Sequence, residues 1–139
     1  MALGDTGILV IHLFLIPLIF LLIIPLRICL CSFPQGGYIE GHFSHDELEG
    51  DGTWVYSNGV AYSGQFVNTM KEGNGRLLSD NGDEYIGQFH KDLRNGHGVQ
   101  RCVNGNRYDG MWLDDLQEGP GKYTWANGQI YDGQMHKGR

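Results

Sequence analysis

The hydrophobic residues of this chain fall into two patterns, a continuous run near the N-terminus and a spaced series behind it. Residues 7–26 are twenty consecutive residues without a charge, GILVIHLFLIPLIFLLIIPL. At a rise of about 1.5 Å per residue, a helix of this length spans about 30 Å, the thickness of a bilayer core. Pro17 removes one backbone donor and predicts a kink, which membrane helices tolerate. The run therefore predicts a single transmembrane helix, followed by a short linker that ends at residue 36.

A cleaved signal peptide is the alternative interpretation, with Cys29 and Cys31 as the small residues of a cleavage site. Signal peptides, however, begin with positive charge and have apolar regions of about 7 to 15 residues. Here the only charge before the longer run is Asp5, so we favour a retained span. Arg27 on its C-terminal flank favours a cytoplasmic position for the residues that follow. Each cysteine could then carry a palmitoyl group or be an inert apolar residue.

Behind the apolar run, glycines recur at a constant step of 23 residues, and such a period indicates a repeat architecture. A tyrosine and a bulky residue keep the same step. The four glycine series are Gly41, Gly64, Gly87, Gly110 and Gly133; Gly50, Gly73, Gly96 and Gly119; Gly52, Gly75, Gly98 and Gly121; and Gly59, Gly82, Gly105 and Gly128. The tyrosines are Tyr62, Tyr85, Tyr108 and Tyr131, and the bulky residues are Phe43, Phe66, Phe89, Trp112 and Met135. Residues 37–139 are therefore predicted to form one tandem array.

Each repeat contains an Asn-Gly pair between two strand-like runs, which is the strongest local signal for a tight hairpin turn. In such a two-residue turn both residues take φ > 0. The pairs are Asn58-Gly59, Asn81-Gly82, Asn104-Gly105 and Asn127-Gly128. Each repeat is therefore predicted to be one hairpin, joined to the next by a seven-residue link. We expect four full hairpins preceded by a partial one, in which Ile39 fills the tyrosine position.

Strand side chains alternate between faces, so the tyrosine, the glycine two residues on and the bulky residue line one packed face. A glycine there leaves a flat patch onto which a neighbouring ring can lie. The incoming strands add Trp54 and Tyr56 in the first unit and Tyr123 and Trp125 in the last. The middle units have smaller residues there, so their face should be less well filled. Because a lone hairpin is marginal, the units are predicted to stack into one elongated, twisted antiparallel sheet, an all-β repeat fold.

The pattern Y-x-G-x-aromatic followed by G-x-G every 23 residues resembles the MORN (membrane occupation and recognition nexus) repeat family. Units such as YIGQFHKDLRNGHGVQRCVNGNR from Tyr85 and YDGMWLDDLQEGPGKYTWANGQI from Tyr108 carry the resemblance. Residues 96–133 are also similar to the N-terminal repeat region of plant phosphatidylinositol 4-phosphate 5-kinases. The resemblance implies roles in membrane association, in protein scaffolding or as an appendage to an enzyme. The last unit stops within its link at Arg139, so a fragment of a longer protein is one expectation.

Composition restricts the partners. Residues 37–139 carry a formal charge of −6, whereas nucleic acids are bound by an excess of Lys and Arg. The same charge opposes a general attraction to anionic lipid. Three cysteines, Cys29, Cys31 and Cys102, imply no disulfide framework. We expect no nucleic-acid partner, and an inward-facing Cys102 that is a small buried residue rather than a nucleophile.

The sequence contains few residues arranged for catalysis or for binding a cofactor or a metal ion. The G-x-G steps lack a following helix-like stretch and no P-loop motif occurs, so we expect no cofactor. His42 and His45, with Asp46 and Glu47, could be drawn as metal ligands, but a solvated loop explains them better. A further acidic group, Asp114, Asp115 and Glu118, lies in a link where nothing supplies the burial needed to shift a pKa for acid–base catalysis.

The sequence therefore predicts a protein without enzymatic activity, with no catalytic, cofactor or metal residues. We expect a membrane-anchored scaffold that offers an aromatic-rich groove to a protein partner. The candidate partner-binding aromatics are Trp54, Tyr62, Tyr85, Tyr108, Trp112 and Tyr131. The alternatives are the N-terminal regulatory part of a phosphatidylinositol 4-phosphate 5-kinase and a phospholipid-binding module.

Overall fold

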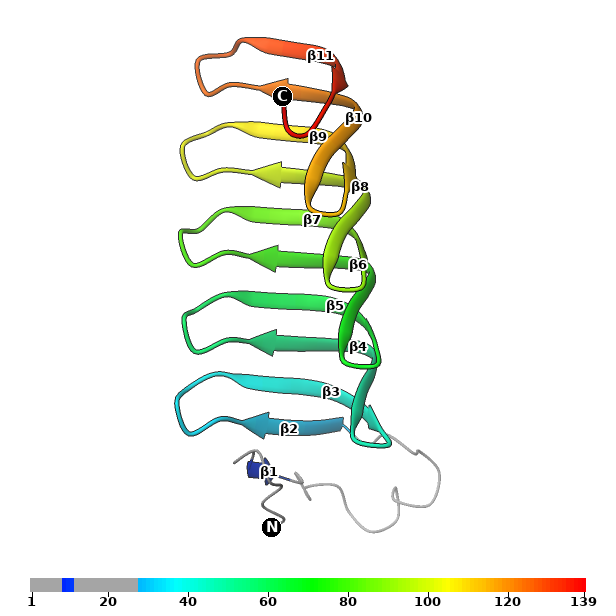
Figure 1. Ribbon diagram of the computed structural model, residues 1–139. Helices are drawn as coiled ribbons and strands as arrows, with labels where there is room; N and C mark the ends of the chain where they lie inside the picture. The colour runs from blue at the N-terminus through cyan, green and yellow to red at the C-terminus, as the bar shows by residue number, and fades with distance from the viewer. Residues whose placement is uncertain (1–8, 12–27) are drawn as a thin grey trace, which may run out of the picture.

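The computed structural model describes residues 9–11 and 28–139. All the elements within these ranges are β-strands, and they form one 11-stranded sheet in which every strand pairs antiparallel with its neighbours in sequence. The strands are β1 (Leu9–Ile11), β2 (Ile28–Ser32), β3 (Tyr38–Ser44), β4 (Glu47–Val55), β5 (Ala61–Val67), β6 (Met70–Leu78), β7 (Glu84–His90), β8 (Leu93–Arg101), β9 (Arg107–Leu113), β10 (Leu116–Thr124) and β11 (Ile130–Met135). Figure 1 shows the result, a long ladder with β1 at one end and β11 at the other. The predicted elongated antiparallel sheet is confirmed.

The sheet begins earlier than the boundary expected at residue 37. Strand β2 pairs with β3 from Ile28 to Ser32, and Phe33 and Gly37 close a turn between them with a hydrogen bond of 3.1 Å. Gly36, in that turn, has φ 98° and lies one step of 23 residues before Gly59. The unit expected to be partial is therefore a complete hairpin. Its Ile39 occupies the tyrosine position as predicted and is 5% exposed.

Most of the predicted membrane helix over residues 7–26 lies outside the described residues. Of that stretch, Leu9–Ile11 are described, and they form strand β1, which pairs with Leu30–Ser32. For these three residues the expectation of a helix is corrected, since pairing with β2 satisfies their backbone groups and aliphatic residues favour strands. Among the described residues no helix has the length and apolarity needed to cross a membrane.

The Asn-Gly pairs lie in hairpin turns as predicted, but the turns are of another type. Gly59 has φ 89°, whereas Asn58 is not among the residues with positive φ. Tyr56 N–H donates to Val60 O over 2.8 Å and Gly59 N–H donates to Tyr56 O over 3.0 Å. This is a three-residue loop, a type I turn followed by a left-handed glycine. The asparagine instead accepts a hydrogen bond of 3.1 Å from Val60 N–H through Oδ1.

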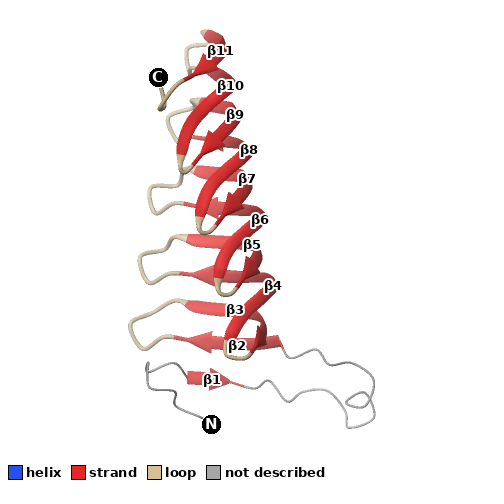
Figure 2. Ribbon diagram, turned by 45° about the vertical axis from the view of Figure 1, so that its right-hand side comes forward, coloured by secondary structure: helices blue, strands red, loops and turns tan. Residues whose placement is uncertain are grey.

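The links between units are hairpins too, which the sequence did not predict. Their two central residues all have φ between 46° and 70°, the geometry of type I′ turns. The turns are His45-Asp46, Asn68-Thr69, Lys91-Asp92 and Asp114-Asp115. At this end the strands curl forward out of the plane of the ladder, so these turns form a second column beside it (Figures 1 and 2). We call this second column the tip column.

Candidate functional site

A row of nine glycines crosses the sheet where the strands bend. From β3 to β11 each strand contributes one glycine, and each lies directly opposite the next in the register. The row is Gly41, Gly52, Gly64, Gly75, Gly87, Gly98, Gly110, Gly121 and Gly133. A Cβ atom added at Gly75, Gly98 or Gly121 would collide with the ring of Tyr62, Tyr85 or Tyr108, respectively. The prediction that rings lie on strand glycines is confirmed.

The aromatic residues on this inner face form a continuous edge-to-face ladder. Tyr62 contacts both Phe66 and Phe89, with ring centroids 5.0 and 5.1 Å apart. Tyr85 contacts Phe89 and Trp112 at 5.1 and 5.3 Å, and Tyr108 contacts Trp112 at 5.3 Å. The interplanar angles are all between 83° and 86°, the T-shaped geometry that aromatic pairs favour. Each unit is therefore joined to the next through its rings.

The tyrosine hydroxyls turn back onto their own strands. Tyr62 Oη donates to Gln65 O and Tyr85 Oη donates to Gln88 O, each over 2.9 Å. The hydroxyl thus satisfies its hydrogen bond where the strand bends over the glycine. Burial raises the pKa of both phenols to about 12. These tyrosines are therefore uncharged near neutral pH and pack as neutral rings.

Two cations cover the tyrosines, and each is held by the tip column. Arg94 lies over Trp112, with Cζ 4.2 Å from the ring centroid, and Arg94 Nε donates to Asp115 Oδ1 over 2.9 Å. Asp115 also accepts from Arg94 N–H and donates its own N–H to Arg94 O. Lys71 and Asp92 repeat the arrangement one unit earlier. These contacts connect each of these type I′ turns to the unit before it and support the positive φ of turn residues other than glycine.

Most of the predicted partner-binding aromatics belong to the core. Tyr62 is 0% exposed, Tyr85 3%, Tyr108 1% and Trp112 4%, so these four rings offer no surface to a partner. The prediction of an aromatic groove is therefore wrong for these four residues, because the strands bend and pack the rings against each other. Of the other two candidates, Trp54 is half-buried and Tyr131, in the last strand, is 42% exposed.

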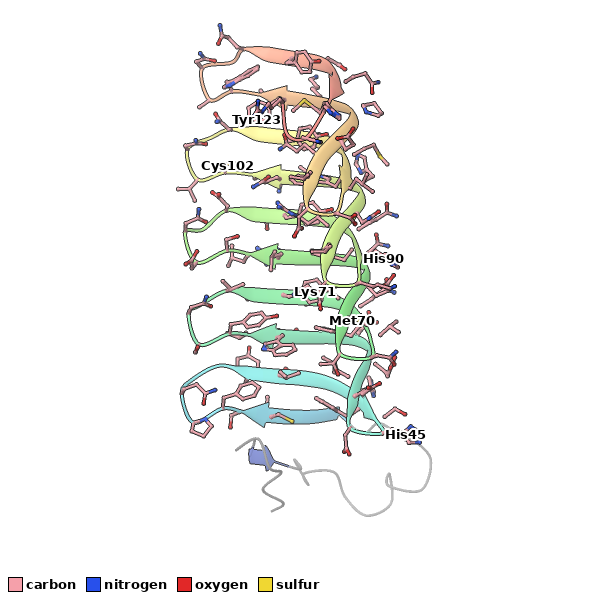
Figure 3. All side chains as sticks on the ribbon, in the orientation of Figure 1. His45, Met70, Lys71, His90, Cys102 and Tyr123 are labelled. Atoms are coloured by element: carbon pink, nitrogen blue, oxygen red, sulfur yellow. The ribbon has the colours of Figure 1, made fainter. Side chains whose placement is uncertain are left out.

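What remains accessible on the inner face is a shelf beside the Asn-Gly turns. At one end Trp54 stacks on Tyr56 with centroids 5.0 Å apart, and at the other Tyr123 lies 4.7 Å from Trp125. The shallow middle is made by the smaller Leu77, Ser79, Gln100 and Cys102. Figure 3 shows Tyr123 and Cys102 on this part of the ladder. We call these eight residues the aromatic shelf. In each ring pair the two aromatic residues are two positions apart in the sequence, which is the spacing from which Trp54 was predicted to face inward.

Charge is segregated between the two faces of the sheet. In strands β3 to β11 the inner-face positions carry no carboxylate, and their charged residues are Lys71 and Arg94. The carboxylates lie on the outer face and in the turns. The eight side chains of the shelf are therefore uncharged on an acidic protein, and the Lys71 ammonium reaches one end of it by donating to Tyr56 Oη over 3.3 Å.

The residues weighed for chemistry take structural positions. Asp115 clamps Arg94, and Glu118 accepts from Lys137 N–H and pairs with His136 over 2.9 Å. His45 lies in a turn and contacts Ser44 Oγ at 3.1 Å through Nδ1. Among residues 9–11 and 28–139 no three metal-ligating side chains come together. Cys102 is half-buried, and burial, with the Asp83 carboxylate nearby, raises the pKa of its thiol.

The family assignment rests on the repeats themselves. The model of the MORN repeat matches residues 40–60, 62–84, 85–107 and 108–130, close to the units of the structure. The chain belongs to the MORN repeat family. No curated protein matches it. The MORN repeat accounts for the hairpins, the glycine row and the aromatic ladder, while the resemblance to plant lipid kinases stays a prediction.

Proposed function

We propose that this MORN repeat protein is a non-catalytic scaffold that binds a protein partner through the aromatic shelf and is tethered to a membrane by the part of its apolar N-terminal run that lies beyond strand β1. One observation carries the first part: an acidic array leaves an uncharged, half-exposed aromatic surface along one face. Aromatic residues that are neither fully buried nor surrounded by charge are enriched where proteins bind each other. The tether rests on the uncharged run of twenty residues.

The ladder of repeats supports a scaffold. Each unit contacts its neighbours in sequence, so the array is a stiff, extended support rather than a globular core. A partner segment along the shelf would meet an aromatic pair at each end and smaller side chains between them. From β4 to β10 is six strand spacings of about 4.8 Å, or about 29 Å. This length suits an amphipathic helix of about 19 residues.

Affinity capture from membranes tests the shelf. The full chain is compared with a triple variant, Trp54→Ala, Tyr123→Ala and Trp125→Ala, and with Val103→Ala as a control. Val103 is 69% exposed in an Asn-Gly turn outside the shelf. A bound protein should be retained by the control and lost with the triple variant. Binding that is indifferent to the shelf residues would refute the proposal.

The tether is tested separately. Carbonate extraction of membranes should leave the full chain in the pellet, and protease protection should report on which side the repeats lie. Release of the chain by carbonate would refute a spanning segment without bearing on the shelf.

A second candidate function is that of a regulatory N-terminal region in a lipid kinase, which the similarity of residues 96–133 to such kinases favours. A transcript that continues past codon 139 into a kinase domain would establish it. A stop codon directly after Arg139 would exclude it.

A further inference from the structure

An apolar pair interrupts a polar row on the outer face of the sheet, the face opposite the aromatic ladder. Ile86 in β7 is 43% exposed and lies directly opposite the half-buried Val99 in β8. Each strand from β3 to β11 contributes one outward-facing residue to this row, and the other seven are Glu40, Thr53, Ser63, Arg76, Asp109, Lys122 and Asp132. An exposed apolar pair framed by polar residues indicates a surface that another protein covers.

Charged residues of both signs frame this pair. On the side of the Asn-Gly turns, Glu84 in β7 lies opposite Arg101 in β8, with 3.3 Å between Glu84 Oε2 and Arg101 Nη1. Along the row, Arg76 in β6 flanks the apolar pair on one side and Asp109 in β9 flanks it on the other. Around the line between β7 and β8, each of these acids therefore has a base at the matching position on the other side.

Two identical sheets packed face to face match this order. The relevant symmetry is a two-fold axis that runs along the strands, between β7 and β8 and midway between the two outer faces. Such an axis reverses the order of the strands and keeps each residue at its level along the strand. The pairs that then face each other across the two copies are Ile86 with Val99, Arg76 with Asp109, and Glu84 with Arg101. At the usual sheet separation of about 10 Å, the apolar side chains interdigitate and the arginines reach the facing carboxylates.

Neighbouring positions of the axis lose this match. With the axis on β7, Glu84 would face itself, and with the axis on β8, Arg101 would face itself. One strand spacing further toward β9, Arg101 would face Arg107, and one spacing toward β6, Ile86 would face Arg76. Facing like charges repel, and an arginine over an apolar residue has no partner for its charge. Among these positions, the axis between β7 and β8 is therefore the one at which opposite charges meet and apolar residues meet.

The remaining outward-facing positions on the straight part of β4 to β11 fit the same axis. No two charges of the same sign face each other there, and Ile130, which is 58% exposed, is covered. The pairs are Ser63 with Lys122, Thr53 with Asp132, Ala61 with Thr124, Val55 with Ile130, and Leu78 with the aliphatic stem of Arg107.

The contact area is sufficient for a specific dimer. Eight strands at about 4.8 Å and four residues at about 3.4 Å give a footprint of about 38 by 14 Å, or about 1,000 Å² over both copies. A specific interface needs about 1,000 Å². The strands curl toward the inner face, where Arg94 covers the Trp112 ring, so the tip columns of the two copies point away from each other (Figure 2).

We propose that the outer face binds a second copy of this chain and forms a two-fold symmetric dimer centred on Glu84, Ile86, Val99 and Arg101. The aromatic shelf lies on the other face, so the dimer does not depend on the function proposed above. The two shelves of the dimer face away from each other, and each is free for a partner segment. At near-physiological ionic strength the charge of −6 on each copy is screened beyond about 8 Å.

Light scattering after size-exclusion chromatography tests the dimer on the full chain in detergent, because it gives the mass of the protein without the detergent. The parent chain should have the mass of two copies. Ile86→Asp places a carboxylate at the centre of the interface and should raise the dissociation constant by about tenfold or more. Val103→Asp, at an exposed turn position outside the outer face, should leave the mass unchanged. A parent chain with the mass of one copy, or a dimer indifferent to Ile86→Asp, would overturn the proposal.

Exchanged charges identify the axis. Glu84→Arg sets arginines over each other at the contact with Arg101, and Arg101→Glu sets carboxylates over each other there, so each variant alone should have the mass of one copy. A mixture of the two variants should form a mixed dimer, because each charge then meets its opposite in the other chain. Variants that dimerise alone as the parent does, or that keep the circular dichroism of the parent and stay separate when mixed, would disprove the axis between β7 and β8.

Discussion

Replacing Gly98 with alanine should be among the most damaging single-methyl changes this fold can receive. Gly98 lies in β8, its φ is not positive, and a Cβ atom there would collide with the ring of Tyr85. Tyr85 is 3% exposed and cannot move outward without leaving the aromatic ladder. It would lose edge contacts with Phe89 and Trp112 and the bond from its hydroxyl to Gln88 O.

The magnitude follows from those contacts. Full expulsion of the ring would forfeit about 1.5–3 kcal/mol of burial, about 0.5–1.5 kcal/mol for each of two ring pairs and about 0.5–1.5 kcal/mol for the hydroxyl bond. Alanine has fewer conformations than glycine in the unfolded chain, and this offsets the loss of stability by about 0.4–1 kcal/mol. Because the ring can yield in part, we expect Gly98→Ala to lower the free energy of unfolding by about 3–5 kcal/mol.

Gly133→Ala is the matched control. Its Cβ atom would lie 2.8 Å from the hydroxyl oxygen of Tyr131 and 3.0 Å from the adjoining ring carbon. That ring is 42% exposed and can swing into solvent, so the cost should stay below about 1 kcal/mol. Urea unfolding followed by tryptophan fluorescence and circular dichroism measures both variants.

A double-mutant cycle decides whether the ring is the cause. In a Tyr85→Leu background the collision is removed, and Gly98→Ala should then cost less than about 1 kcal/mol. If alanine at position 98 costs as much in the Tyr85→Leu background as in the parent chain, the assignment of this glycine to the tyrosine ring is wrong.

Two further predictions concern the tip column. Arg94→Met should lower the free energy of unfolding by about 1–3 kcal/mol, since it removes the ion pair with Asp115 and the cation over Trp112. The control Lys91→Met should be nearly neutral. Thermal unfolding compares the two variants, and equal effects would contradict a stabilising role for the Arg94–Asp115 pair. Hydrogen bonds from His90 and Lys91 N–H lower the pKa of the Glu72 carboxyl below its usual 4.5. A carboxyl with a depressed folded pKa stabilises the fold above its unfolded pKa and loses this contribution as the pH falls through the folded value. The melting temperature should therefore decline in acid below about pH 4.5, and Glu72→Gln should flatten that decline; an unchanged pH profile would contradict it.

The sequence predicted the architecture because the 23-residue period has local causes. Each tyrosine needs a glycine beneath it, and each Asn-Gly pair marks a turn whatever surrounds it. Even so, glycine has three different roles within one repeat. Gly98 gives space to a ring, Gly96 has φ 96° at the bend, and Gly105 has φ 93° in a turn. Spacing alone shows that glycines recur, whereas the backbone and its neighbours determine why.

The type I′ turns of the tip column escaped prediction because their stability comes from the neighbouring unit. Lys91 and Asp92 have positive φ, which costs an ordinary residue about 1–2 kcal/mol. Asp92 recovers this through hydrogen bonds to the backbone N–H and O of Lys71, 21 residues away. No window of local sequence contains that pairing. The same limit explains the partner candidates: Tyr62 looked available because the ring that covers it, Phe89, lies in another unit.

The tyrosine of each unit is buried by a ring from the unit that follows it, and this order relates the fold to the proposed binding surface. Tyr62 is covered by Phe89 and Tyr85 by Trp112, so each unit's core is closed by the unit that follows it. The tyrosines of the inner units are 0–3% exposed, whereas Tyr131, whose strand has no described strand beyond it, is 42% exposed. The aromatic shelf extends to this end of the ladder through Tyr123 and Trp125. A partner segment that reaches this end of the shelf would contact Tyr123 and Trp125 beside the exposed ring of Tyr131, so its binding should stabilise the last described hairpin.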